Sequence, residues 1–322
     1  MYASSPSWEN RWINISDLNL ILRKLANSFS GKYPSRVKGV LGINYGLHFT
    51  GGEPFLNFEL LLRAIELAKR YNIPSLFVET NSFWCTNDRT TEEKLIRLKE
   101  AGLDGILISA NPFLIECVPF RRTKRCVRLS VKVFGEDNVM MYHPVFYEQL
   151  IKLKIEGVLK FEEYLSRMTR LDPHSLSLAL SPTLVLPMGR AVYNLKLFYP
   201  KFPAKFFFRE HCLEDLTRPW HIHIDCYNNY IPGYCAGISL GDARKLEEIV
   251  QGVELDDRPI LKALATNLGE LYKFAVKEYG YRERRDGYIS KCHLCLDIRK
   301  HIISVTKEFK ELRPAEFYKH LC

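Results

Sequence analysis

The sequence lacks the features that mark several large classes of protein. No apolar run reaches the roughly 18–20 residues of a membrane span, so no membrane contact is expected. The N-terminal stretch MYASSPSWENRW has no basic region followed by an apolar one, so no signal peptide is expected. No internal repeat stands out, and a composition of 47% apolar and 26% charged residues excludes a disordered or collagen-like chain. We therefore expect a cytoplasmic protein.

A strong excess of one charge is also missing. The 322 residues include 46 basic and 37 acidic side chains, and the net charge of +9 somewhat favours anionic partners. The basic residues are scattered, apart from one dense cluster formed by Arg121, Arg122, Lys124, Arg125 and Arg128. Such a cluster is more typical of a solvated face or a phosphate contact than of a nucleic-acid platform. An RNA-modifying enzyme is therefore only our third interpretation.

Strand and helix patterns alternate three times in the first part of the chain. Strands are predicted at 45–50, 75–80 and 104–110, and helices at 16–29, 58–73 and 90–102. Ser16 is the expected N-cap of the first helix and Thr90 or Thr91 that of the third, with Gly102 just past its end. This order predicts an α/β fold with a parallel sheet and right-handed crossovers.

The pattern changes near residue 200. Before it, strands are predicted at 138–143 and 177–186 and helices near 145–153 and 160–168. The stretch 198–208 has two prolines and is the expected junction between domains 1–200 and 201–322. After it, 220–235 alternates and turns at Asn228-Asn229, which predicts a β-hairpin, and helices follow at 257–279 and 293–309.

The string HFTGGEPFL carries the first chemical signal. A predicted strand ends in Gly51 and Gly52, where the backbone can approach a ligand closely. Glu53 follows at the carboxyl end of that strand, the edge at which α/β sheets bind ligands. Its carboxylate and the backbone carbonyls would suit an ammonium group.

This string resembles the GGE motif of radical S-adenosylmethionine (radical SAM) enzymes. The resemblance implies that Gly51, Gly52, Glu53 and Pro54 bind the amino group of S-adenosylmethionine (SAM). It also implies a partial (β/α)6, TIM-like barrel over residues 1–200 that lacks its first strand.

The next strands resemble the same family, with departures. In VETNS, Asn81 would contact the ribose or the substrate, although Ser82 replaces the family's glycine. In ISANP, Ser109 would contact the cofactor carboxylate, although Ala110 and Asn111 replace Leu and Asp. Arg190, in VLPMGRA, is expected at the end of a late barrel strand, where it would bind a cofactor or substrate carboxylate.

Four of the nine cysteines form the second signal. Cys212, Cys235, Cys292 and Cys295 have the spacing C-x22-C-x56-C-x2-C, which offers four thiolates to an iron–sulfur cluster or to zinc. The spacing does not separate the two metals. The stretch 225–237 resembles the hairpin of SPASM and Twitch domains, which implies one auxiliary [4Fe–4S] cluster.

No cysteine precedes Cys85, so the family's CxxxCxxC motif is absent from this chain. Its three thiolates hold the [4Fe–4S] cluster that makes the 5′-deoxyadenosyl radical from SAM. The resemblance places the motif at or just before Met1. A start assigned too late is our preferred explanation, ahead of a shortened gene or a piece supplied by another chain.

We therefore expect a radical SAM enzyme homologue with one auxiliary cluster. Its substrate would be a peptide or a small molecule, and its electron donor a ferredoxin or flavodoxin. The alternative is a non-catalytic scaffold or binding protein, stabilised by zinc or a cluster and built on a degenerate barrel.

Overall fold

The computed structural model describes residues 5, 7–29, 41–42 and 46–321. The chain forms two compact units: residues 18–184, which we call the sheet unit, and residues 1–17 with 185–322, which we call the cysteine unit. The division at Val185 precedes the proline-containing stretch 198–208, which lies within the cysteine unit. The functional assignment of domains 1–200 and 201–322 stays a prediction.

A parallel four-stranded sheet organises the sheet unit and confirms the predicted α/β class. Its strands are β1 (Leu47–Phe49), β2 (Leu76–Thr80), β3 (Gly105–Ser109) and β4 (Val139–Tyr142), in the order β1-β2-β3-β4. The register pairs Phe49 with Val78, Thr80 with Ile108 and Ser109 with Tyr142. The carboxyl ends of the strands therefore meet at one edge.

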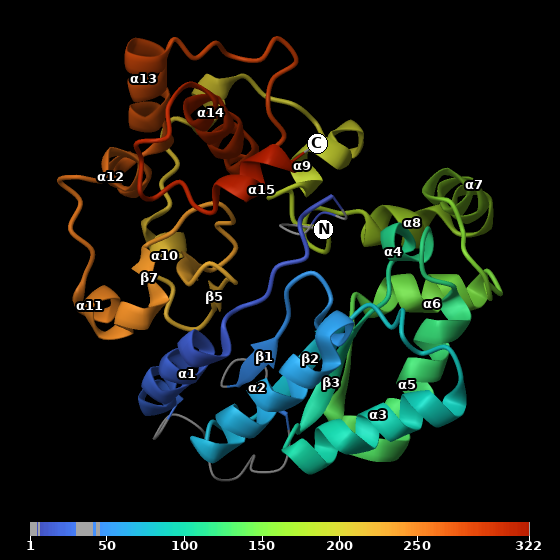
Figure 1. The fold of residues 1–322 in the computed structure, drawn as a ribbon. Coiled ribbons are helices and arrows are strands. Elements are labelled where there is room, and N and C mark those ends of the chain that lie inside the picture. The colour runs from blue at the N-terminus through green and yellow to red at the C-terminus, as the bar shows by residue number, and fades with distance from the viewer. Residues whose placement is uncertain (1–4, 6, 30–40, 43–45, 322) are drawn as a thin grey trace. The chain divides into compact units, whose positions relative to one another are not determined.

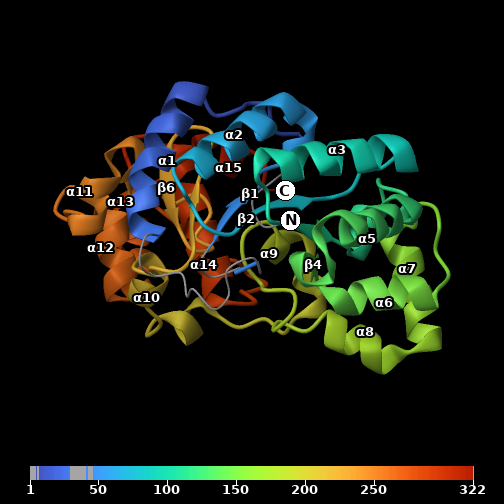
Figure 2. The same ribbon diagram turned by 90° about the horizontal axis from the view of Figure 1, so that it is seen from below.

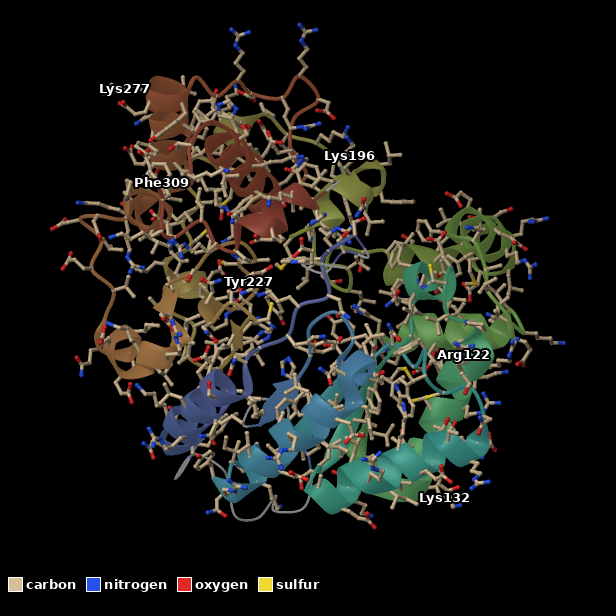
Figure 3. All side chains as sticks on the ribbon, viewed as in Figure 1. Arg122, Lys132, Lys196, Tyr227, Lys277 and Phe309 are labelled. Carbon is tan, nitrogen blue, oxygen red and sulfur yellow. The ribbon has the colours of Figure 1, made fainter. Side chains whose placement is uncertain are left out.

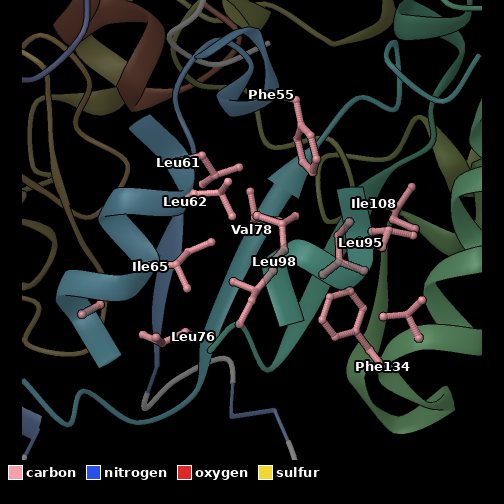
Figure 4. Packing of buried hydrophobic residues seen from close by; sticks show 14 of the residues in the cluster. Phe55, Leu61, Leu62, Ile65, Leu76, Val78, Leu95, Leu98, Ile108 and Phe134 are labelled. Carbon is pink, nitrogen blue, oxygen red and sulfur yellow. The ribbon is translucent and has the colours of Figure 1, made fainter. Parts of the chain in front are cut away.

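Three amphipathic helices cover one face of this sheet. They are α2 (Phe58–Arg70), α3 (Asp88–Ala101) and α5 (Phe120–Phe134), which follow β1, β2 and β3 and lie along the strands (Figures 1 and 2). Leu62 and Ile65 of α2 and Leu98 of α3 point toward Leu76 and Val78 in the core (Figure 4). The opposite face, with His48, Phe77 and Leu107, is not part of this cluster of buried side chains.

Two of the helices are capped at their N-termini by asparagine side chains and not by the predicted hydroxyl groups. The Oδ1 atom of Asn14 accepts the N–H of Ser16 before α1 (Ile15–Phe29), and Asn87 caps α3 by accepting the N–H of Thr90. The Ser16 and Thr90 or Thr91 predictions were therefore wrong by a few positions. Gly102 ends α3 as predicted, with the positive φ of 111° that favours glycine.

The described residues of the sheet unit form further helices. These are α4 (Pro112–Ile115), α6 (Pro144–Lys152), α7 (Phe161–Leu171) and α8 (Pro173–Ala179). The predicted strand at 177–186 is wrong, because α8 occupies its first residues and Leu176, Ala179 and Leu180 are buried at helical spacing. Asp172 caps α8 by accepting the N–H of Ser175.

The predicted hairpin organises the cysteine unit. Strand β5 (Ile222–Ile224) pairs antiparallel with β6 (Asn229–Pro232), and a strand that was not predicted, β7 (Gly241–Asp242), adds to β6. Arg11 packs on this hairpin, where its guanidinium lies 4.4 Å from the centre of the Tyr227 ring.

Helices complete the cysteine unit. They are α9 (Ala191–Asn194), α10 (Leu213–Leu216), α11 (Leu246–Gln251), α12 (Pro259–Thr266), α13 (Leu268–Tyr279), α14 (Lys291–Val305) and α15 (Ala315–Lys319). The helical stretch predicted at 257–279 is divided at Asn267, which ends α12 and caps α13. None of the described helices has the length and apolarity needed to cross a membrane.

Candidate functional site

The loop after β1 presents two glycines at the carboxyl edge of the sheet. Gly51 and Gly52 are exposed, and Gly51 has a φ of 141°, which disfavours other residues. A Cβ atom built at either position would meet no atom within 4 Å. The space above this backbone is therefore open to a ligand.

Glu53 is buried beneath this loop and ties it to β2. Its Oε1 atom accepts the Thr80 hydroxyl at 2.9 Å and the Phe55 N–H at 3.2 Å, and its Oε2 atom accepts the Asn81 N–H at 2.7 Å. The Trp84 indole N–H in turn donates to the Thr80 Oγ1 atom at 2.9 Å. The carboxylate thus fixes the glycine loop against the end of β2.

Burial raises the pKa of Glu53 from 4.5 to about 7, although its three hydrogen bonds oppose the shift. The unfolded chain releases this proton near pH 4.5, whereas the folded chain keeps it to about pH 7. Between these values the folded state binds more protons, so the free energy of unfolding falls as pH rises. For the wild type we expect a fall of about 3 kcal/mol in the free energy of unfolding across this pH range, measured by urea unfolding. The Glu53→Gln variant should not show this fall.

Glu66→Gln is the matched control for this prediction, because Glu66 is an exposed carboxylate of α2. Its pH profile should follow that of the wild type. Parallel profiles for Glu53→Gln and the wild type would show that Glu53 titrates alike in the folded and unfolded states.

A second carboxylate, Glu79, joins three strand ends on the face of the sheet opposite to α2, α3 and α5. Glu79 accepts the Thr50 hydroxyl at 2.9 Å and the Ser109 hydroxyl at 3.2 Å, one on each carboxylate oxygen. Alternation along β2 sends Val78 and Thr80 to the helix side and Glu79 to the other. Glu79 is only partly buried, so its negative charge is accessible at this edge.

His143 follows β4 at the same edge. Its φ of 61° is unusual for a residue with a Cβ atom. Burial lowers the pKa of His143, whereas the negative charge of Glu79 opposes this shift. Thr50, Glu79, Ser109 and His143 therefore form a row of polar side chains across the ends of all four strands.

The four predicted metal-binding cysteines all belong to the cysteine unit. Cys292 and Cys295 lie in α14, Cys212 precedes α10, and Cys235 follows β6. Burial and then the neighbouring thiols raise the pKa of Cys235 and Cys292 to about 12. The thiols are thus near one another, yet no three His, Cys, Asp or Glu side chains among the described residues are arranged as ligands of one ion.

Comparison with known protein families identifies the segment that carries the glycine loop. Residues 40–128 match the family model described as Radical SAM superfamily. Residues 40–128 are thus similar to a radical SAM superfamily domain, and we call them the radical SAM segment. The match spans β1, β2 and β3 and includes Gly51, Glu53, Glu79 and Ser109. No curated protein matches the sequence.

In the radical SAM segment, Asn81 and Ser109 both lie at strand ends, as predicted. The Asn81 Oδ1 atom accepts the Phe83 N–H at 2.9 Å and so shapes the loop after β2, while Ser109 donates to Glu79. Their proposed contacts with SAM stay predictions. The sequence analysis did not include Glu79 among the site residues. The sequence did hold a signal for it, because Glu79 lies near the end of a predicted strand whose two predicted neighbours also end in polar residues.

Arg190 is not at the end of a strand. It precedes the short helix α9 and belongs to the cysteine unit, outside the matched radical SAM segment. The expected strand end is wrong because it depended on a strand at 177–186, where α8 and turns are found. The contact of Arg190 with a cofactor or substrate carboxylate stays a prediction.

Most side chains of the dense basic cluster on α5 are bonded to other groups of the chain. On α5, Arg125 and Arg128 pair with Asp88, and Lys124 pairs with Glu156 (Figure 3 labels Arg122 and Lys132 of the same helix). Arg122 donates to the Phe83 carbonyl at 2.6 Å. These contacts hold α5 to α3 and to the loop after β2, and they disfavour the RNA interpretation.

The residues at the strand ends fit SAM but not the radical-generating cluster. Open backbone at the glycines and the accessible Glu79 carboxylate suit a cationic ligand. No thiol precedes Cys85, and Cys85 and Cys126 are fully buried and hydrogen-bonded to each other. We derive no step through that cluster from these residues.

Proposed function

We propose that this chain binds SAM at the carboxyl edge of β1–β4 and is a radical SAM enzyme homologue. The observation that carries the proposal is the convergence of the glycine loop and Glu79 within the matched segment. Its substrate would be a peptide or a small molecule. Its reductant would be a ferredoxin or flavodoxin.

The chain's own residues would orient the ligand. Gly51 and Gly52 are exposed residues of this loop, and backbone carbonyl oxygens can accept hydrogen bonds from an amino group. Glu79 places a negative charge on the same edge, and the hydroxyls of Thr50 and Ser109 hold its two oxygens in position. When bound, SAM supplies the radical chemistry of the family.

The cysteine unit would hold a second metal centre through Cys212, Cys235, Cys292 and Cys295. Support comes from their shared unit, their mutual electrostatic influence and the ability of four thiolates to bind a [4Fe–4S] cluster. A non-catalytic, zinc-stabilised binding protein is the second candidate, because zinc accepts the same four ligands.

SAM binding tests the first part of the proposal. Equilibrium dialysis with radiolabelled SAM should give a Kd below about 1 mM for the anaerobically purified full chain. Glu79→Gln should weaken binding about tenfold, about 1.4 kcal/mol, because a negative charge beside a cationic ligand is lost.

Glu66→Gln removes the same charge from the exposed face of α2 and should leave the Kd unchanged. A wild-type chain that does not retain SAM, or a Glu79→Gln variant that binds as tightly as the wild type, would contradict the proposed site. Iron, acid-labile sulfide and zinc content separates the two candidates: about four irons and four sulfides indicate a cluster, and one zinc without sulfide indicates the second candidate.

A further inference from the structure

Arg299 of α14 is a buried cation in the cysteine unit. Its side chain belongs to a residue that is only 5% exposed, and no other lysine or arginine among the described residues is buried. No carboxylate among those residues pairs with its guanidinium. Arginine keeps its charge in proteins, and a buried charge is costly unless its surroundings compensate it. The groups that contact Arg299 therefore need to supply negative charge.

The Arg299 guanidinium bonds to three groups from separate segments. Its Nε atom donates to the Cys295 Sγ atom at 3.3 Å, one turn earlier in α14. Its Nη1 atom donates to the Ala236 carbonyl at 3.1 Å and to the Tyr318 hydroxyl at 2.7 Å. Ala236 follows Cys235 in the loop after β6. Arg299 thus ties a thiol of α14 to the loop that carries a second thiol.

This loop is also fixed against α15, which packs on α14 (Figure 1). The Tyr318 hydroxyl donates to the Gly237 carbonyl at 2.5 Å. Gly237 has a φ of 79°, and a Cβ atom built there would lie 2.4 Å from the Phe317 ring, so this close approach requires glycine. The backbone beside Cys235 is therefore held in one place by Arg299 and Tyr318 together.

The thiols are the groups that can supply the negative charge. Cys295 contacts the guanidinium, and Cys235 and Cys292 lie within its electrostatic reach. Cysteines that bind a metal do so as thiolates. Four thiolates around zinc or around a [4Fe–4S] cluster leave a net negative charge, which a neighbouring cation stabilises. A buried guanidinium at this place fits the metal centre proposed for the four cysteines.

Lys291 provides the contrast. Its charge also acts on Cys212 and Cys292, but its side chain is 31% exposed and pairs with Asp215 at 3.0 Å. A carboxylate therefore already balances Lys291, whereas Arg299 has only neutral groups and the thiols around it.

We propose that Arg299 is a positioning residue and the counter-charge of the four-cysteine metal centre. It would hold Cys295 and the Cys235 loop within reach of one metal centre and balance part of the negative charge of the bound thiolates. This inference rests on the metal centre of the proposed function and adds to it a residue that is not itself a ligand.

Zinc titration of the metal-free full chain tests the proposal, with Zn²⁺ alone as the probe because it accepts four thiolates. Competition with a chromophoric chelator, under reducing and anaerobic conditions, gives the Kd. Arg299→Gln should weaken zinc binding about 10–100-fold, the usual cost of removing a hydrogen-bond partner of a metal ligand. Arg299→Lys keeps the charge but not the planar fork, so its Kd should lie between those of Arg299→Gln and the wild type.

Arg258→Gln is the matched control, because Arg258 also belongs to the cysteine unit and donates to a backbone carbonyl, that of Leu240, at 2.7 Å. Its zinc affinity should equal that of the wild type. The rise in melting temperature on zinc addition should shrink in Arg299→Gln and not in the control, which separates weaker metal binding from a less stable fold.

Wild-type zinc affinity in Arg299→Gln would overturn the proposal, and so would equal losses in Arg299→Gln and Arg299→Lys, because the charge would then not matter. If Arg299→Gln does not fold, Arg299→Lys decides alone, since the proposal requires it to bind zinc more weakly than the wild type. A wild-type chain that binds no zinc also overturns the proposal. The iron and sulfide analysis described above then decides separately whether the metal centre itself exists.

Discussion

Trp84→Ala is expected to lower the free energy of unfolding by about 3–5 kcal/mol, the largest effect that we predict for a core position of the sheet unit. The Trp84 ring is 6% exposed and stacks on Phe55 with centroids 3.9 Å apart. Its removal leaves a cavity in the core and takes away the donor to the Thr80 hydroxyl. Urea unfolding followed by circular dichroism gives the measurement.

Two further variants make the Trp84 prediction specific. Trp84→Phe keeps an aromatic ring against Phe55 and loses the indole N–H, so it should cost only about 1 kcal/mol. Trp220 is 55% exposed, and Trp220→Ala should change stability by less than about 0.5 kcal/mol. Equal costs for the two alanine variants would mean that Trp84 does not support the core as described.

Cys292→Ser is expected to remove the metal that we propose for the cysteine unit and to lower the melting temperature of that unit sharply. Serine keeps the size of the side chain but does not supply the thiolate that zinc and iron–sulfur clusters require. Structural zinc binding contributes about 10–16 kcal/mol of apparent free energy in small domains, and that energy is coupled to folding. Metal analysis and calorimetric melting measure both consequences.

Cys117→Ser is the control for this variant, because Cys117 is an exposed thiol of the sheet unit. Its metal content and melting should match the wild type. If Cys292→Ser keeps the full metal content and the wild-type melting profile, the four-cysteine assignment is wrong.

The parallel sheet could be predicted from the sequence because local signals agreed with the tertiary fold. The predicted strands at 75–80 and 104–110 each contain a short apolar run, at 76–78 and 106–108, as buried parallel strands require, and each is followed by a periodic helix. The hairpin could be predicted because its residues alternate and Asn228 marks the turn. In the structure, Asn228 adopts the positive φ of 65° that this turn needs. The strand at 177–186 failed because a short apolar run does not separate strand from helix.

The site was harder to predict because its members meet only through strand register. Glu53 was found from a contiguous motif. Glu79, by contrast, belongs to the site because it bonds to Thr50 and Ser109, which lie 29 and 30 residues away in the sequence.

The Asn81 N–H has an acceptor outside the sheet ladder, in the buried carboxylate of Glu53. Its exchange with solvent deuterium therefore requires the glycine loop to lift, whereas exchange of the neighbouring β2 amides requires the sheet itself to open. The exchange rate of this one amide therefore reports how often the glycine loop lifts from the edge of the sheet while the strands stay paired.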